Sequence, residues 1–242
     1  MSGHSKWHNI QKTKGAQDAK RAAAFTKIAK ELIVAVKEGG GITDPANNSR
    51  LATVITKAKA ANMPNDNIKR CLEKAAGGAG GDNYESIQYE GYGPGGVAVI
   101  VEPLTAHRHR TAGNMRHHFD KYGGNLGTNG CVAWSFDKKG VLVIDNSEEE
   151  LDEEEVMMDA MDAGADDFEA DGDVFTIYTL PDDFNEVAGN LSKYTFVSAQ
   201  IEMVPQNYQR LETEEQVKLM EKLIEIMEDD DDVQNVWHNW EE

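Results

Sequence analysis

The chain has little cysteine, little positive charge and no long hydrophobic run. Its two cysteines, Cys71 and Cys131, are too few and too isolated for a disulfide framework or a zinc site, and favour small buried side chains in a reducing cytosol. No run of about 18 apolar residues occurs, so no membrane-spanning helix is expected. The basic N-terminus lacks the apolar stretch of a secretory signal. These absences predict a cytoplasmic protein with no membrane partner.

Positive charge is scarce overall but concentrated at one end. The 242 residues hold 24 Lys and Arg against 43 Asp and Glu, a formal net charge of −19. Residues 1–74 nevertheless carry 14 basic and 6 acidic side chains, whereas the remainder carries 10 and 37. This asymmetry indicates a polyanionic partner for the basic part, from which the acidic part would be repelled.

The first thirty residues form a basic arm that holds one acid, Asp18, and a tryptophan, Trp7, between Lys6 and His8. Lysines with an interleaved aromatic suit a phosphate backbone and a base to stack on. The candidate nucleic-acid-binding residues here are His4, Ser5, Lys6, Trp7, Asn9, Lys12, Lys14, Lys20, Arg21 and Lys27. Alternatively, Trp7 is a core residue and the lysines are ordinary solvated helix faces. No groove-reading motif is present, so we expect recognition of backbone and shape.

Hydrophobic spacing predicts three short helices after the arm. The first carries one apolar stripe and ends at three consecutive glycines, residues 39–41. The second covers residues 51–58, and Pro64 opens the third in its first turn. A glycine-rich linker, residues 77–81, follows. The stripe of the first helix is Phe25, Ile28, Leu32 and Val36.

Beyond the linker the pattern changes to that of strands. Residues 87–92, 97–101 and 131–136 are predicted strands, and residues 111–122 a helix. The Gly-Pro-Gly-Gly segment at 93–96 is expected to be a tight turn, because the spacing of a phosphate-binding loop is absent. Residues 141–204 then show the β-α-β-β-α-β order of a ferredoxin-like domain.

A helix at 214–228 and a strand at 233–237 have no place in that completed unit, which predicts an insertion. The expected fold class is α+β multidomain: a small N-terminal helical domain followed by two ferredoxin-like α+β domains, one inserted in the other. The predicted boundaries are 1–81 for the basic helical domain with its arm, 82–136 and 206–242 for a discontinuous α+β domain, and 137–205 for the acidic inserted domain.

A second basic island lies in the acidic part of the chain. The segment 105–111 precedes the predicted helix at 111–122, and helix N-termini favour anions. Arg108, Arg110 and Arg116 are therefore candidate phosphate contacts. The nearby histidines could suggest a metal, but they lack ligand spacing, so no metal and no cofactor is predicted. These histidines are His107, His109, His117 and His118.

The most acidic segment, residues 145–173, holds fifteen acids and no lysine or arginine. No EF-hand pattern occurs in it, so solvated faces are expected, or else a contact with a basic protein such as a ribosomal protein. No catalytic triad, paired-carboxylate signature or Cys-His dyad is evident, and no enzyme activity is predicted.

Four motifs in the same order closely resemble the YebC family: GHSKWHNIQ, AQDAKRAAAFTKI, KAKAANMPNDNIKR and EGYGPGGVAVIVE. Members of that family are widely described as probable transcriptional regulators and include a mitochondrial translational activator of cytochrome oxidase. The resemblance implies the same three-domain arrangement, and either promoter DNA or ribosomal RNA and tRNA as the target. The sequence departs from the family's usual TDNRNRT at Ala106, His107 and His109, while Arg108 and Arg110 persist.

The leading hypothesis is a non-enzymatic nucleic-acid-binding regulator of gene expression, acting on the ribosome as a translation factor that relieves stalls. RNA is preferred because no symmetric dimer or recognition-helix motif is readable, and a basic arm suits an irregular RNA surface. The alternatives are a DNA-binding transcriptional regulator, an acidic protein-interaction adaptor and, last, a metal-dependent enzyme using the histidines. No self-pairing motif occurs, so a monomer is expected.

Overall fold

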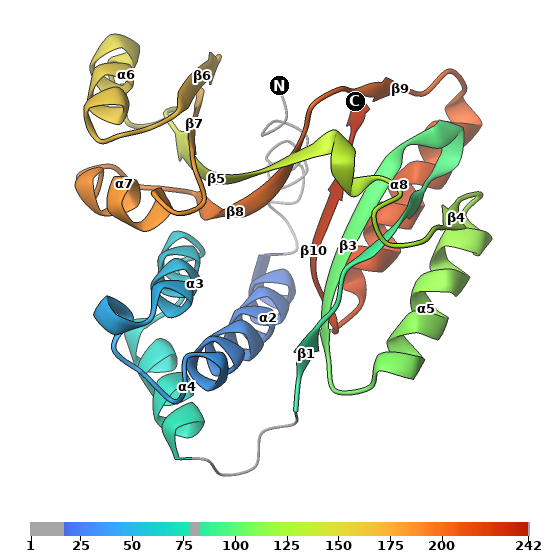
Figure 1. The fold of residues 1–242 in the computed structure, drawn as a ribbon. Coiled ribbons are helices and arrows are strands. Elements are labelled where there is room, and N and C mark those ends of the chain that lie inside the picture. Colours follow the sequence, from blue (N-terminus) through green and yellow to red (C-terminus); the bar gives the residue numbers. More distant parts are fainter. Residues whose placement is uncertain (1–16, 78–82, 242) are drawn as a thin grey trace. The chain divides into compact units, whose positions relative to one another are not determined.

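The computed structural model describes residues 17–77 and 83–241, with side chains from Arg21 onward (Figure 1). The described residues fall into two compact units. One comprises residues 17–77 and 138–202, and the other residues 83–137 and 203–241. In these ranges no helix combines the length and apolar character needed to cross a membrane. The expected α+β class is confirmed, with a helical N-terminal region followed by two β-rich domains.

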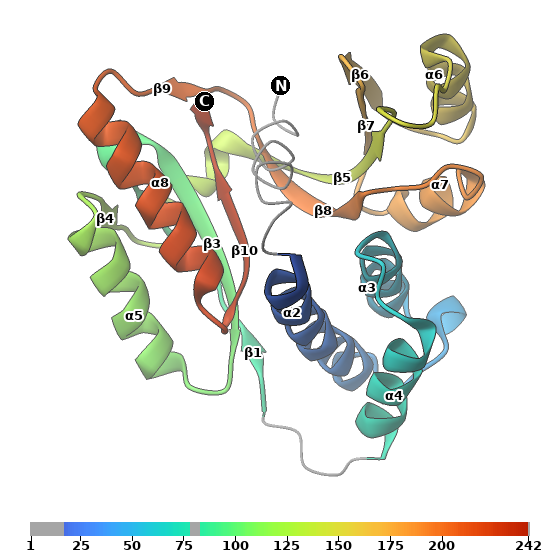
Figure 2. The same cartoon turned by 180° about the vertical axis from the view of Figure 1, so that it is seen from behind.

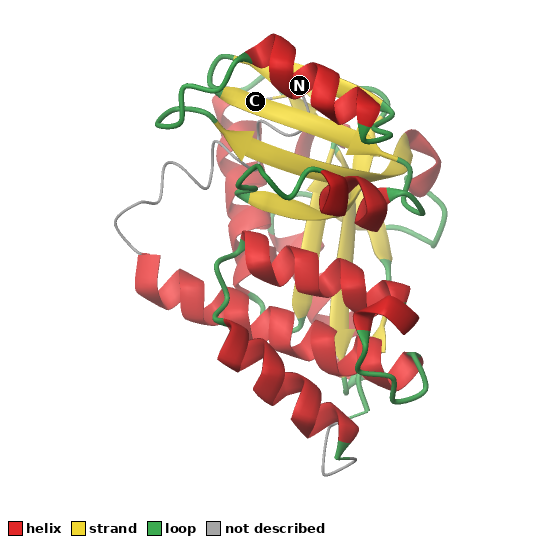
Figure 3. Cartoon of the chain, turned by 90° about the vertical axis from the view of Figure 1, so that its left-hand side faces the viewer, coloured by secondary structure: helices red, strands yellow, loops and turns green. Residues whose placement is uncertain are grey.

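Three helices make up the N-terminal region: α2 (Gln17–Glu38), α3 (Ser49–Ala60) and α4 (Asn65–Ala76), with a short 3-10 helix, η1 (Pro45–Asn47), before α3. The predicted stripe of α2 is buried at Ile28, Leu32 and Val36. It packs against Leu51 and other apolar side chains of α3 and α4. Figure 3, coloured by secondary structure, shows these helices together. Pro64 is the N-cap of α4 and not a residue of its first turn.

Asn48 joins α2 to α3 through both ends of its side-chain amide. Its Oδ1 accepts the Leu51 N–H at 3.0 Å, which caps α3. Its Nδ2 donates to the carbonyls of Ala35 at 2.9 Å and Ile42 at 3.1 Å. Gly39 lies against this amide, and a Cβ at that position would clash with Nδ2. One buried side chain therefore caps α3 and bonds to two carbonyls at and beyond the end of α2.

The domain inserted later in the chain has a four-stranded sheet. Its elements are β5 (Phe136–Asp145), α6 (Glu153–Asp162), β6 (Asp167–Asp171), β7 (Val174–Thr179), α7 (Phe184–Asn190) and β8 (Ser198–Pro205). The spatial order is β6-β7-β5-β8, which is the ferredoxin-like order. Val156 of α6 and Val187 of α7 share one core with Leu142 and Phe175, so both helices cover the same face of the sheet. In the same unit, the Asn185 side chain of α7 donates to Thr53 Oγ1 of α3 at 3.0 Å.

The other unit is built on a five-stranded sheet. Its strands are β1 (Glu85–Ser86), β2 (Tyr89–Tyr92), β3 (Ala98–Thr105), β4 (Asn125–Leu126) and β10 (Val233–His238). β3 pairs antiparallel with β2 on one side and with β1 and β10 on the other, and β2 pairs with β4. The helices α5 (Arg108–Lys121) and α8 (Glu214–Asp229) lie side by side on one face, as Figures 1 and 2 both show.

This sheet has the ferredoxin-like spatial order of strands, but the strands occur in a different order along the sequence. The order β10-β3-β2-β4 corresponds to that of the inserted domain, but β2 precedes the first strand-helix unit and does not follow it. The predicted strand at 131–136 is wrong. These residues form a loop and the 3-10 helix η3 (Ala133–Ser135), and the strand β5 begins only at Phe136. The apolar alternation there arises because Val132 and Phe136 pack on the sheet face opposite α5 and α8.

Smaller differences concern where elements begin and end. Asp152 caps α6, and the chain enters α7 only after Asp183. The Gly-Pro-Gly-Gly segment is the expected strand-to-strand turn, with a 3-10 turn, η2 (Pro94–Gly96), between β2 and β3. A two-residue parallel pairing of β9 (Gln209–Arg210) with β11 (Trp240–Glu241) was not predicted.

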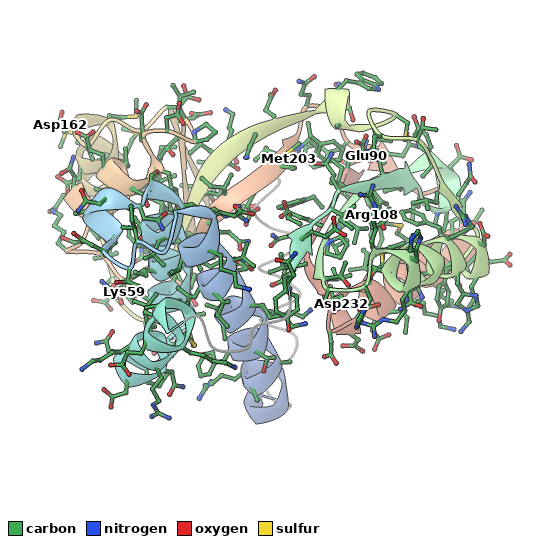
Figure 4. All side chains as sticks on the ribbon, turned by 60° about the horizontal axis from the view of Figure 1, so that its bottom comes forward. Lys59, Glu90, Arg108, Asp162, Met203 and Asp232 are labelled. Carbon is green, nitrogen blue, oxygen red and sulfur yellow. The ribbon has the colours of Figure 1, made fainter. Side chains whose placement is uncertain are left out.

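Glu90 is a buried carboxylate on β2 that holds the loop after β4 (Figure 4). Its oxygens accept the backbone N–H groups of Gly130 at 2.8 Å, Val132 at 3.0 Å and Ala133 at 2.8 Å. Burial alone would raise the pKa of Glu90. The hydrogen bonds from these three amides and from the Gln88 side chain outweigh burial and hold the pKa below its ordinary value.

We expect Asn48→Ala to lower the free energy of unfolding of the helical region by about 2–3 kcal/mol, because the cap of α3 and the buried hydrogen bonds to the carbonyls of Ala35 and Ile42 are removed. Amide hydrogen exchange in α2 and α3 measures this directly. Asn47→Ala is the matched control, since the exposed Asn47 side chain bonds to Asp44 beside it. Equal protection in the two variants would contradict the assigned role of Asn48.

The loop held by Glu90 should respond to acid. Because the pKa of Glu90 is lowered in the folded state, the carboxylate stabilises the loop above the ordinary pKa of 4.5 and that stability is lost as pH falls through the lowered value. In an NMR titration, the amides of Gly130, Val132 and Ala133 should shift together with a midpoint below 4.5. Glu90→Gln should abolish that transition, whereas Glu85→Gln on an exposed strand should leave it unchanged. A midpoint at or above 4.5 would contradict this account.

Candidate nucleic-acid interface

Most of the predicted arm residues lie outside the described residues: His4, Ser5, Lys6, Trp7, Asn9, Lys12 and Lys14. Lys20 is in the first turns of α2, in a part where only the backbone is described. Arg21 is exposed on the same helix, and Lys27 is half-buried with an interaction partner. Along the sequence the arm continues into α2. The buried apolar stripe of α2 fixes the position of that helix in the helical region.

The helices α2, α3 and α4 carry a surplus of positive charge. Residues 21–77 hold ten Lys and Arg against five Asp and Glu. Three of those acids pair with cations of the same region. Lys57 Nζ lies 2.7 Å from Glu31, Arg50 pairs with Glu38, and Lys69 lies 4.0 Å from Glu73. The pairs of Glu31 and Glu38 join α2 to α3, and the pair of Glu73 lies within α4.

Several cations remain available on this region. Four exposed side chains have no carboxylate within ion-pair distance among the described residues: Arg21, Lys59, Arg70 and Lys74. Lys59 is labelled on α3 in Figure 4. Arg70 and Lys74 are one turn apart on α4, so a single polyanion segment can meet both. Such exposed cations release counterions when they meet phosphates, which favours association at low salt.

The second basic island has a different local structure from the one predicted. Helix α5 begins at Arg108 with His107 as N-cap, so Arg108 and Arg110 lie inside its first turn and do not precede it. Thr111, predicted as the first helical residue, is fully buried, and its hydroxyl donates to Thr105 Oγ1 at 2.9 Å. Arginine is a good helix former, so the run extends the helix by a turn.

Both arginines of that turn have carboxylate partners. Arg110 Nη2 lies 2.9 Å from Asp232 Oδ2, and Arg108 lies 3.8 Å from Glu85. Asp232 is buried and also accepts from the Thr105 hydroxyl at 3.2 Å, and Thr105 Oγ1 in turn accepts from the Thr111 hydroxyl. Figure 4 labels Arg108 and Asp232 in this unit. Asp232 thus ties the entry of α5 to the turn between α8 and β10, and Arg110 completes that network.

Arg116 differs from the other two arginines. It is exposed two turns further along α5 and has no ion pair among the described side chains. Of the three predicted phosphate contacts, it alone is not engaged by an acid of this unit. His107 and His109, where the sequence departs from the family pattern, are exposed at the start of α5.

The nearby histidines do not converge on a common point. Within residues 17–77 and 83–241, no group of three His, Cys, Asp or Glu side chains is arranged to hold a metal ion. His118 faces Asp230 at 3.7 Å. Burial lowers the pKa of His118, although the Asp230 carboxylate opposes that shift. Cys71 and Cys131, expected to be buried, are both half-buried free thiols.

The fold and the charge distribution define a class of three-part α+β protein: a basic helical region followed by two acidic ferredoxin-like domains, one inserted in the other. A family model described as the TACO1/YebC protein N-terminal domain matches residues 5–78, and one described as the TACO1/YebC second and third domain matches residues 84–240. The chain therefore belongs to the TACO1/YebC family.

Two relatives illustrate how close the similarity is. Proteins of Acetivibrio thermocellus and Finegoldia magna, each named a probable transcriptional regulatory protein, are 54% identical to this chain over 242 and 243 residues, which covers at least 99% of each chain. The crystal structure of a conserved hypothetical protein from Aquifex aeolicus is 42% identical, with a TM-score of 0.81, and covers 93% of this chain and 91% of its own.

We expect Asp232→Ala to lower the free energy of unfolding by about 2–3 kcal/mol, because the buried Thr105 hydroxyl and the Arg110 guanidinium lose their acceptor. Urea denaturation followed by circular dichroism measures the change. Asp229→Ala removes the same charge from an exposed position of α8 and should change stability by less than about 0.5 kcal/mol. Equal effects of the two substitutions would refute the proposed network.

Proposed function

We propose that this protein is a nucleic-acid-binding regulator of gene expression that binds the phosphate backbone through its basic N-terminal part. The supporting observation is the separation of charge: 14 of the 24 basic side chains fall in residues 1–74, and exposed cations without acidic partners remain on α2, α3 and α4. The rest of the chain is acidic and would be repelled from the same polyanion, so the basic part faces the target.

We further propose a division of labour along the chain. The helical domain at 1–81 makes the backbone contacts. The discontinuous domain at 82–136 and 206–242 adds Arg116 and holds the second basic island, while the inserted domain at 137–205 remains free for a protein partner. An adaptor whose acidic domains act alone would leave the exposed cations of α4 without a role.

DNA is the first target to test, because the relatives from Acetivibrio thermocellus and Finegoldia magna are called probable transcriptional regulatory proteins. The ribosome is the second candidate, since the family that the motifs resemble includes a translational activator. Both targets present phosphates to the same cations, so salt dependence alone does not separate them. The test must therefore compare both ligands directly.

We expect Lys6→Glu/Lys12→Glu/Lys14→Glu and, separately, Arg70→Glu/Lys74→Glu to weaken binding and to flatten the plot of log affinity against log salt. Each phosphate that the variant no longer neutralises should reduce the slope by about 0.7 for a single strand and about 0.9 for duplex DNA. Fluorescence anisotropy with duplex promoter DNA, together with co-sedimentation with ribosomes, measures both targets across a salt series.

Lys218→Glu/Lys222→Glu is the matched control, because it reverses the charge of two exposed lysines on α8, in the acidic part of the chain. Control affinity should equal that of the wild type. Loss of binding to DNA alone identifies a DNA-directed regulator, and loss of binding to ribosomes alone identifies a translation factor. Binding that ignores the N-terminal substitutions would overturn the proposal in favour of an acidic adaptor.

A further inference from the structure

The loop between β4 and β5 exposes a tryptophan. Trp134 is 72% exposed, the largest fraction among the large hydrophobic side chains in the described ranges. Single exposed hydrophobic residues are common at protein surfaces and need no explanation. Trp134 differs because the loop that presents it is held from several sides, so that its exposure is a fixed feature of the fold.

The loop is attached to β2 at both of its ends. The Gly127 N–H donates to the Glu90 carbonyl at 2.8 Å, and the Glu90 carboxylate accepts from Gly130, Val132 and Ala133. Val132 is buried against the sheet, on the face opposite α5 and α8. The backbone on both sides of Cys131 is therefore fixed, and Trp134 is presented from a held segment.

Two aromatic side chains meet at a single atom of this loop. The Trp134 indole N–H donates to the Cys131 carbonyl oxygen at 3.0 Å, and the Tyr92 hydroxyl donates to the same oxygen at 3.1 Å. Tyr92 is 40% exposed. The polar end of each ring is thus satisfied within the protein, while ring surface remains in solvent. This arrangement leaves stacking as the interaction that the pair can still offer.

The loop itself carries no charged side chain. Residues 122–136 contain no charged side chain, whereas residues 75–242 as a whole contain 37 acids. Thr128, Asn129 and Gly130 are exposed beside the aromatic pair and bring small polar groups and backbone. A nucleic acid that is repelled by most of this acidic part meets no carboxylate of the loop itself, and the Glu90 carboxylate beneath the loop is buried and bonded to its amides.

We propose that Trp134, supported by Tyr92, is a stacking platform for an unpaired base of a single-stranded nucleic acid. Stacking on a fixed aromatic ring tolerates any base and costs little conformational entropy on binding. The inference rests on the proposed nucleic-acid-binding function. It adds a second contact, which distinguishes single-stranded from duplex nucleic acid. Glu90 is the positioning residue, because it holds the loop and does not touch the base.

The test measures the affinity of the full chain for a short single-stranded oligonucleotide of mixed sequence, as RNA and as DNA, and for the matching duplex. Trp134→Ala should weaken single-strand binding by about 5- to 100-fold, the effect of one stacked base. The slope of log affinity against log salt should stay unchanged, because stacking releases no counterions. Trp134→Phe should restore most of the affinity, and duplex affinity should not change.

A second readout follows Trp134 itself. Single-stranded ligand should quench part of the tryptophan fluorescence of the wild type, and that part should be missing in Trp134→Phe, although this variant still binds. Single-strand affinity that is the same in the wild type and Trp134→Ala, with arm-dependent binding intact, would overturn the stacking platform alone. If the wild type bound no oligonucleotide at all, the proposed function would fail and the platform with it.

Discussion

The pairing of β3 with β10 is the constraint on which the second unit depends. β3 is the central strand of the five-stranded sheet, and its partners come from opposite ends of the unit: β2 immediately before it and β10 at the end of the chain. The core between this sheet and its two helices includes Val99, Met115, Met220 and Val236. It cannot close until the whole inserted domain has been synthesised. The inserted domain must therefore fold without preventing β3 from pairing with β10. Its self-contained βαββαβ order is consistent with that requirement.

Two buried carboxylates secure the irregular parts of that sheet. Glu90 fixes the loop that follows β4, and Asp232 fixes the entry of α5 to the turn after α8. Each satisfies several donors at once, which offsets the cost of burying a charge. Apolar packing alone would hold the strands and helices but not these loops, because loops offer few side chains to bury. The same carboxylates position side chains at the surface. Glu90 holds the segment that carries Trp134, and Asp232 accepts a hydrogen bond from Arg110.

Regular elements were predictable from the sequence because each has a strong local pattern. The stripe of α2, the β-α-β-β-α-β order after residue 136 and the apolar run of β3 all follow from periodicity. The segment at 131–136 misled the prediction, because Val132 is buried from a loop that Glu90 holds, and the strand begins only at Phe136. The start of α5 was missed because the His-Arg run suggested a loop. Its true start depends on Asp232, more than 120 residues away, and such long-range partners leave no local signal in a single sequence.

Two of the three arginines of the second basic island already have acidic partners within the fold. From the sequence, Arg108, Arg110 and Arg116 form one group of cations before and within a helix. In the structure, Arg110 completes a network around a buried aspartate and Arg108 lies near Glu85, so both have structural partners that a phosphate would have to compete with. Arg116 faces solvent without such competition. Of the second basic island, Arg116 therefore remains for a ligand, together with the uncharged aromatic loop. Binding by this unit would depend less on salt-sensitive attraction to phosphates than binding by the helical region. There, Arg21, Lys59, Arg70 and Lys74 are exposed without an acidic partner among the described residues.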